Sequence, residues 1–287
     1  MPACLFASDL HGRTKRYLAL FSVIEAERPA AVFLGGDLLP SGLGFAPDPD
    51  HPDFINDFLA PGIERLRRSM GPGFPDVFAI LGNDDPRIEE AAMLDASARG
   101  LWRYAHDRRI DWEGYTVYGY ACVPPTPFRL KDWERFDVSR FVDPGCSPPE
   151  EGWHTVPVGE HELRYGTIQG ELEALVGDGS LARAIMLFHS PPYRSLLDRA
   201  ALDGRSVDFA PLDVHVGSIA IQRLIRDRQP LVTLHGHVHE SARITGAWRQ
   251  QAGTTVMIGA AHDGPELALV RFDPSRPGAA ERELIAP

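Results

Sequence analysis

The sequence predicts an α/β fold built around a parallel β-sheet, with polar residues gathered at one edge of that sheet. An apolar run at residues 3–7 is followed by helix-like spacing of apolar residues at 14–27 and by a second apolar run at 31–34. A strand, a helix and a strand in this order form a right-handed crossover unit with parallel strands. Both apolar runs end in loops that carry an aspartate, Asp9 and Asp37. Open α/β sheets bind their ligands at the edge where such loops lie.

The rest of the chain continues this alternation of apolar runs and helix-like segments. Short apolar or alternating runs predict further strands at 77–81, 115–120, 184–188, 230–234, 254–258 and 267–272. Helical spacing predicts helices at 54–70, 167–176 and 218–228. Thr167 is the expected N-cap of the second of these helices, because its hydroxyl can accept a hydrogen bond from a backbone amide. Residues 40–53 are rich in proline, glycine and aspartate and are expected to form an irregular loop.

The segment at about 123–158 differs in composition from the sequence around it. It contains seven prolines and five aromatic residues, which is unlike the strand-forming runs on either side. We interpret it as an inserted cap or rim segment that lies outside the sheet; a passive surface loop is the alternative. The sequence has no internal repeat and no low-complexity tract, so we expect residues 1–287 to form a single domain that carries this insertion.

The composition excludes several classes of protein. A formal net charge of −11 argues against a surface that holds duplex or other long nucleic acid. The three cysteines are too few and too widely spaced to predict a disulfide framework or a cysteine metal site. No apolar stretch is long enough to span a bilayer, and no signal segment is recognisable, so we expect a cytoplasmic protein without a membrane partner. The sequence leaves the oligomeric state open.

Five predicted strands end in residues that can bind metal: Asp9 with His11, Asp37, Asn83, His189, and His237 with His239. Alternate side chains of an extended segment share a face, so the last two histidines can point into one space. Each motif alone is a weak signal, because Asp-x-His arises by chance, Gly-Asp and Gly-Asn often form turns, and buried histidines are often only hydrogen-bonded. Their common placement favours a metal site. Nitrogen and oxygen ligands without thiolate suit Mn²⁺, Fe or Zn²⁺, and do not suit Cu(I).

Taken in order, these five blocks resemble the motifs of the calcineurin-like metallophosphoesterase superfamily. Those motifs are Asp-x-His, Gly-Asp, Gly-Asn-His, a single His, and Gly-His-x-His, and the resemblance extends from about residue 3 to residue 260. It implies a four-layer αββα sandwich, in which two facing mixed β-sheets are flanked by helices.

The resemblance also implies a dinuclear metal centre. Asp9, His11 and His239 correspond to the ligands of one metal ion. Asn83, His189 and His237 correspond to the ligands of the second, and Asp37 would bridge the two. We expect two divalent or mixed-valence ions, with Mn²⁺ as the first choice and Fe or Zn²⁺ as alternatives. Such a pair can activate a water molecule and stabilise both the attacking and the leaving oxygen of a phosphoester.

The sequence departs from the family at Asp84, where most members have a histidine near the leaving group. Two nearby cations should keep this carboxylate ionised, so it would be a poor proton donor. The enzyme could therefore work without this acid on substrates with good leaving groups. Another residue could supply the proton, with His235 and His215 as candidates, although both could be structural. As a third alternative, the protein would bind metal and phosphate without catalysis.

The function implied is hydrolysis of a small phosphoester by metal-bound hydroxide. Arg13 and Arg194 lie in suitable loops to contact the substrate; surface ion pairs are the alternative for both. We favour a phosphodiesterase acting on a small or nucleotide-like substrate, because a diester carries less negative charge near Asp84. A phosphomonoesterase and a non-catalytic protein that binds metal and phosphoryl ligands are the alternatives.

Overall fold

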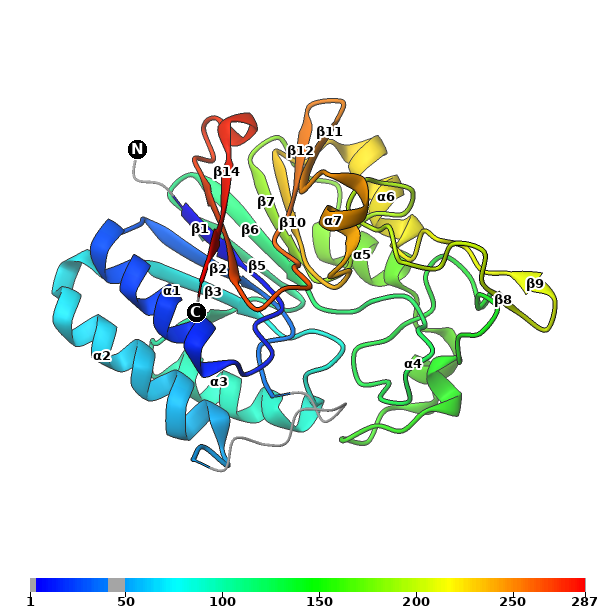
Figure 1. Cartoon of the computed structure of the whole chain (residues 1–287), viewed down its shortest axis with the longest axis horizontal. Coiled ribbons are helices and arrows are strands. Elements are labelled where there is room, and N and C mark those ends of the chain that lie inside the picture. The colour runs from blue at the N-terminus through cyan, green and yellow to red at the C-terminus, as the bar shows by residue number, and fades with distance from the viewer. Residues whose placement is uncertain (1–3, 41–49, 287) are drawn as a thin grey trace.

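The computed structural model describes residues 4–40 and 50–286 and contains two six-stranded β-sheets (Figure 1). The first sheet has the order β14 (Glu281–Ile285), β13 (Leu267–Phe272), β1 (Cys4–Ala7), β2 (Ala31–Gly35), β3 (Asp76–Ile80) and β4 (Arg103–Tyr104). The second has the order β11 (Arg249–Ala252), β12 (Thr255–Gly259), β10 (Val232–His235), β7 (Ala184–Phe188), β6 (Tyr115–Tyr120) and β5 (Arg108–Trp112). Of the expected loop at 40–53, residues 41–49 lie outside the described residues.

Both sheets are mixed, and helices cover their outer faces. In the first sheet β1 to β4 are parallel, whereas β13 and β14 are antiparallel to their neighbours. In the second, β6, β7, β10 and β12 are parallel, and β5 and β11 are antiparallel. The helices that cover these faces include α1 (Thr14–Glu27), α2 (Ala60–Met70), α5 (Ile168–Val176) and α6 (Ile219–Arg228). Figure 1 shows α1 and α2 beside the first sheet and α5 and α6 beside the second, which confirms the predicted four-layer sandwich.

An aromatic cluster joins the two sheets in the core. Phe33 of β2 stacks on Phe78 of β3, with ring centroids 5.1 Å apart. Trp112 of β5 packs edge-on against both rings, at 6.2 Å and 5.9 Å. Its indole nitrogen donates a hydrogen bond of 3.0 Å to Asp76, so the second sheet is also fastened to the first by a polar contact. Buried aromatic pairs of this kind stabilise a core beyond their area alone.

Several short elements differ from the prediction or were not predicted. The expected helix at 54–70 begins with a π-helical turn at Phe54–Leu59 and continues as α2. The structure adds the short helices α4 (Glu160–Tyr165) and α7 (Ser241–Thr245) and a hairpin of β8 (Ser206–Val207) and β9 (Ala210–Pro211), and the segment after Pro86 forms a 3₁₀ turn and then the helix α3 (Glu90–Ala98). Thr167 caps α5, where its side chain accepts a hydrogen bond from the amide of Gly170. No described helix is long and apolar enough to cross a membrane.

Candidate metal centre

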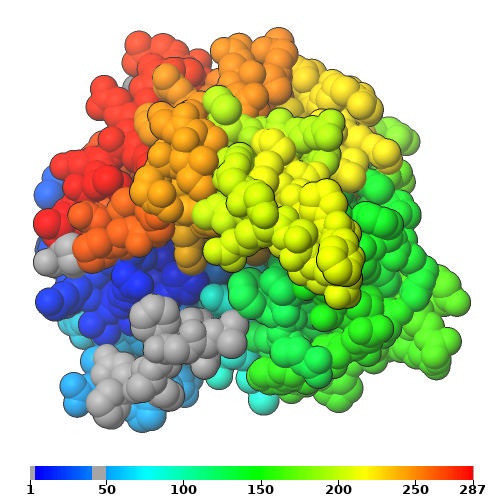
Figure 2. Space-filling view, turned by 45° about the vertical axis from the view of Figure 1, so that its right-hand side comes forward, coloured from blue at the N-terminus to red at the C-terminus, as the bar shows by residue number. Residues whose placement is uncertain are grey.

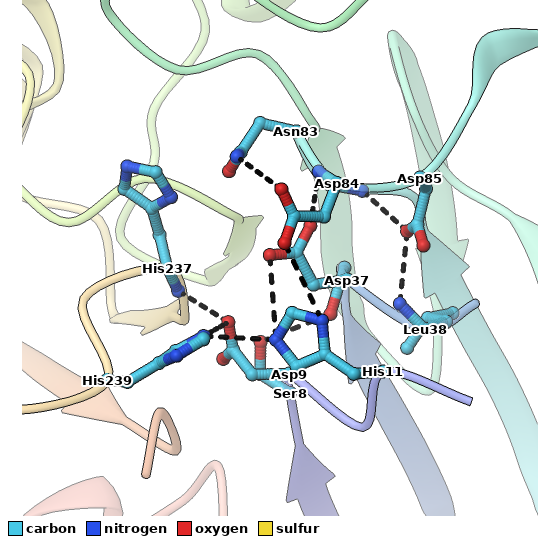
Figure 3. Close-up of polar contacts among 12 residues, drawn as sticks. Ser8, Asp9, His11, Asp37, Leu38, Asn83, Asp84, Asp85, His237 and His239 are labelled. Carbon is cyan, nitrogen blue, oxygen red and sulfur yellow. Dashed lines mark hydrogen bonds and ion pairs between the residues drawn. The ribbon is translucent and has the colours of Figure 1, made fainter. Parts of the chain in front are cut away.

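The loops that follow β1, β2, β3, β7 and β10 meet at one edge of the sandwich, and they carry the residues expected there from the sequence (Figure 3). Four of these residues have left-handed backbones: Asp9 (φ 58°), His11 (φ 49°), Asp37 (φ 51°) and His237 (φ 73°). This conformation is uncommon outside glycine and concentrates at functional sites. The side chains are therefore aimed by backbone turns that the surrounding structure must hold in place.

Glycines allow these loops to approach one another closely. A β-carbon on Gly82 would lie 2.3 Å from Oδ1 of Asp37, and one on Gly236 would lie 2.0 Å from Oγ of Ser8. Both distances are far below van der Waals contact, so a larger residue would displace Asp37 at position 82 and the side chains of Ser8 and Asp9 at position 236. The Gly-Asn and Gly-His pairs of the sequence are thus explained by the packing of neighbouring loops.

Four of the predicted ligands form a compact first group. Asp9, His11, Asp37 and His239 each offer one ligand atom within 4.8 Å of the others. Nε2 of His11 lies 3.1 Å from Nε2 of His239, and Oδ1 of Asp9 lies 3.2 Å from the same His239 atom. All but His239 are buried. A cation between these atoms would satisfy oxygen and nitrogen lone pairs that otherwise face one another.

The remaining predicted ligands lie around His189, which is fully buried. Its Nε2 atom is 3.0 Å from Oδ1 of Asn83 and 3.3 Å from Oδ2 of Asp37. The ring of His237 meets that of His189 edge-on, with centroids 5.2 Å apart. The backbone amide of His237 donates a hydrogen bond of 2.9 Å to Asp9. Asp37 therefore contacts both groups.

The donor atoms fit a metal cation. Nδ1 of His189 lies 2.8 Å from the carbonyl of Gly35 and must carry a proton to make this bond, so a neutral ring turns the Nε2 lone pair toward two oxygens. Only a second proton or a metal ion makes that arrangement favourable. Four buried side-chain atoms of the described residues have no hydrogen-bond partner, and two of them, Asp9 Oδ2 and His11 Nδ1, belong to this centre; the other two belong to His154 and Arg282. Buried polar atoms without partners are rare, and a metal ion would supply a partner for the two in the centre.

The titration of these residues gives the same picture. Burial lowers the pKa of His189, but the charge of Asp37 outweighs it and raises the pKa to about 10. Burial raises the pKa of Asp9, but the hydrogen bond and charge of His239 lower it to about 2. Both shifts follow from the same cause, because a positive charge beside Asp9 and Asp37 is favoured by their carboxylates.

Asp84 lies at this centre, as the sequence motif implied. Its backbone amide donates a hydrogen bond of 2.9 Å to Oδ1 of Asp37, and its Oδ2 atom is 3.8 Å from Nδ1 of His11. The side chain is 19% exposed, so it faces both the buried ligands and the solvent. In the protein without bound metal, burial first and the charge of Asp37 second raise its pKa to about 7. Metal cations act in the opposite direction and favour the ionised form.

The two histidines considered as proton donors occupy structural positions. His235 is fully buried, and its ring nitrogens lie 2.9 Å from the carbonyl of Ser190 and 2.7 Å from Oγ1 of Thr233. Burial lowers its pKa to about 4, so the ring is neutral at neutral pH and is a poor general acid. His215 pairs with the buried Asp198 at 2.8 Å. These contacts favour the structural alternative for both residues.

The two predicted substrate arginines are placed differently. Arg13 is partly buried and precedes the first residue of α1, in the loop that carries His11. Arg194 is exposed on the loop after β7, where its guanidinium packs over the ring of Tyr193 at 5.3 Å. These positions are compatible with contact to a substrate, and the substrate roles of both arginines stay predictions.

Three positioning residues were not found from the sequence. The buried Asp85 carboxylate accepts hydrogen bonds from the amides of Leu38 (3.0 Å), Leu39 (2.7 Å) and Gly82 (2.9 Å), and thereby joins the loops that carry Asp37 and Asn83. The buried Arg16 side chain donates a hydrogen bond of 2.7 Å to the carbonyl of Asp9 and further hydrogen bonds to the carbonyls of Gly264 and Pro265. The indole nitrogen of Trp133, in the inserted segment, donates a hydrogen bond of 2.8 Å to the carbonyl of Asp85. The position of Asp85, two residues after Asn83, was the only signal in the sequence.

Comparisons with known proteins agree with this geometry. A family model described as calcineurin-like phosphoesterase matches residues 4–241. No curated protein sequence gives a significant match. TT1561 of Thermus thermophilus has 16% identity and a TM-score of 0.56, covering 99% of this chain and 98% of that chain. Phosphopantetheinyl hydrolase PptH of Mycobacterium tuberculosis has 10% identity and a TM-score of 0.51, and the match covers 91% of this chain and 90% of that chain. These structures share the fold, and the family match shows that the chain belongs to the calcineurin-like phosphoesterase family.

Proposed function

We propose that this family member hydrolyses small phosphodiesters with two metal ions held by the seven residues of the candidate centre. The observation that carries the proposal is Asp37, whose Oδ2 atom lies 4.0 Å from Nε2 of His11 and 3.3 Å from Nε2 of His189. Asp9, His11 and His239 would hold one ion, and Asn83, His189 and His237 the other, with Asp37 between them. Two ions in such a centre lower the pKa of water and stabilise charge on phosphate oxygens. Mn²⁺ is our first choice, and Fe or Zn²⁺ fit the same donors.

Asp84 supports a preference for diesters. Its partly exposed carboxyl lies 3.8 Å from His11, so a substrate bound at the metal ligands would lie close to it. An ionised Asp84 repels phosphate oxygens, and a monoester dianion is repelled more strongly than a diester monoanion. The chain also carries a formal charge of −11, which disfavours highly charged or long nucleic-acid substrates.

The inserted segment supports a bounded site for small substrates. Asp132 of this segment accepts a hydrogen bond of 2.7 Å from the amide of Arg87. The hydroxyl of Thr155 accepts one of 2.9 Å from the amide of Ile88. Together with the bond from Trp133 to Asp85, these contacts fix the segment to the loop that carries Asn83 and Asp84. Figure 2 shows its green surface beside a hollow that the blue and orange parts of the chain also border. We propose that 123–158 is one wall of the substrate site within a single domain.

The test compares bis-nitrophenyl phosphate with nitrophenyl phosphate, using metal-stripped protein reloaded with Mn²⁺. We expect faster turnover of the diester, loss of both activities in His239→Ala, and no change in Asp178→Asn, which alters an exposed aspartate. Asp84→Asn removes the repulsion and should raise the monoester rate relative to the diester rate by about ten-fold. An unchanged ratio in Asp84→Asn would remove the basis for the diester preference.

Asp84→His tests the missing acid separately. This change introduces the residue that most family members have, so it should raise activity on diesters with poor leaving groups more than on nitrophenyl esters. The same dependence on the leaving group in both proteins would contradict this view of Asp84. Stoichiometric metal binding without turnover of any ester would favour the alternative of a protein that binds metal and phosphoryl ligands.

A further inference from the structure

A groove of about 780 Å³ lies away from the metal centre, where the edge strands of the two sheets come together. It is bounded by the start of β3, by β4 and β5, and by the turn that follows α3; none of the metal-centre residues lines it. Asp76, the first residue of β3, lines the groove, whereas Asn83 of the metal centre lies in the loop after the other end of this strand. At about 3.3 Å per residue, the two ends of this segment are on the order of 20 Å apart.

The charge of this groove is opposite to that of the whole chain. Its lining includes three arginines, Arg103, Arg108 and Arg109, and one acidic residue, Asp76. Arg67 adds a fourth guanidinium at the rim, where it donates hydrogen bonds to the carbonyls at positions 99 and 100. In a chain with a formal charge of −11, such a local excess of arginine creates a region of positive potential.

The arginines are available to a ligand. Arg103 pairs with Asp76 at 2.7 Å and Arg109 lies 3.8 Å from Asp111, but the two guanidinium side chains are 44% and 63% exposed. Exposed pairs of this kind contribute little and can exchange partners. Arg108 is also exposed and has no ion pair within residues 4–40 and 50–286. Arginine binds phosphate oxygens through paired N–H donors more readily than any other side chain.

The other walls of the groove favour a ligand that is more than a bare anion. Phe74, Pro75 and Ile110 give it an apolar side, and Ser97 adds a hydroxyl group. The volume falls within the usual range for sites that bind small molecules and cofactors. A ligand with a phosphate group and a flat or apolar body would use both the arginines and this apolar side.

We propose that this groove is a second ligand site, separate from the metal centre, which binds a nucleoside phosphate or a similar small phosphorylated compound. The phosphate groups lie against Arg103, Arg108 and Arg109, and the flat portion lies against Phe74 and Ile110. The formal net charge of −11 favours compact anions over a long polyanion as the ligand. This proposal does not depend on the catalytic activity of the metal centre.

Calorimetric titration with ADP tests the proposal, using the full chain in EDTA and again in Mn²⁺. We expect Arg108→Gln to weaken ADP binding about ten-fold in EDTA, because one charge-assisted contact is lost. Arg226→Gln is the matched control, since Arg226 is an exposed arginine outside the groove that pairs with its neighbour Asp227. The double variant Arg108→Gln/Arg109→Gln should weaken binding further, and His239→Ala should leave the EDTA titration unchanged.

Two further probes separate the parts of the ligand. Inorganic pyrophosphate should bind more weakly than ADP but respond to Arg108→Gln in the same way, and adenosine should bind far more weakly than either. The proposal is overturned if ADP binds only when Mn²⁺ is present and this binding is lost in His239→Ala. It is also overturned if adenosine binds as tightly as ADP, if Arg108→Gln changes nothing, or if the wild type shows no binding at about 1 mM ADP.

Discussion

Asp85→Asn is predicted to destabilise the protein by separating the two loops that carry Asp37 and Asn83. The Asp85 carboxylate is fully buried and accepts three amide hydrogen bonds, two at Oδ2 and one at Oδ1. Asparagine retains one acceptor oxygen, which can keep the amides of Leu38 and Gly82. Its NH₂ group then faces the amide of Leu39, so two donors meet without an acceptor.

The size of the effect follows from these contacts. A buried donor without a partner costs about 2 kcal/mol, and replacing a charged acceptor by a neutral one costs about 1 kcal/mol for each of the two remaining bonds. Burial first and the charge of Asp37 second raise the pKa of Asp85, so a neutral asparagine avoids part of the cost of burying this charge and the repulsion from Asp37. That relief returns about 1 kcal/mol. We therefore expect the free energy of unfolding to fall by about 3 kcal/mol.

The assay is urea unfolding at neutral pH, followed by circular dichroism, with Asp178→Asn as the matched control. Asp178 is exposed, so its replacement should change the free energy of unfolding by less than about 0.5 kcal/mol. Asp85→Asn should also weaken Mn²⁺ binding, because Asp37 and Asn83 lose their common support. A loss of stability as small as that of the control would refute the view that Asp85 joins these loops.

Three further changes test the supports of the site. Trp133→Phe removes the 2.8 Å hydrogen bond to the carbonyl of Asp85 and should weaken Mn²⁺ binding about ten-fold in an equilibrium titration, with the fold retained. Arg16→Gln leaves buried carbonyls without donors and should lower the free energy of unfolding by about 2 kcal/mol in urea. Burial first and the charge of Arg135 second lower the pKa of His106 to about 3. As the pH falls from 7 to 5, His106 therefore takes up a proton in the unfolded chain and not in the folded protein, and the free energy of unfolding falls. His106→Asn should reduce this fall by about 2 kcal/mol in urea titrations at the two pH values, whereas replacing the exposed His161 in the same way should not.

The positions of the metal-centre residues could be predicted because they depend on a strong local signal. Buried parallel strands such as β2 and β7 are short apolar runs, and the residue after each run lies at one edge of the sheet. The pairing of these strands into two facing sheets came from the family resemblance, since apolar runs alone do not determine which strands are neighbours. Elements of two residues, such as β4 and β8, were missed because they carry no periodicity.

The supports of the centre could not be predicted, because they depend on contacts between distant parts of the chain. Asp85 bonds to the amide of Leu39 across 46 positions, and Trp133 reaches the carbonyl of Asp85 across 48. Arg16 bonds to the carbonyl of Gly264 across 248. In the sequence, each of these side chains resembles an ordinary surface charge or a core aromatic residue. Their roles became apparent only when the loops were placed together.

The most direct test of the central claim is the number of Mn²⁺ ions that the metal-stripped chain binds, measured together with turnover of bis-nitrophenyl phosphate during the same titration. We expect two ions per chain, with turnover that rises as the second ion binds. Asp37→Asn should weaken both ions and abolish turnover, because this carboxylate contacts both ligand groups. A single ion at saturation, or full turnover in Asp37→Asn, would contradict a two-metal centre that depends on Asp37.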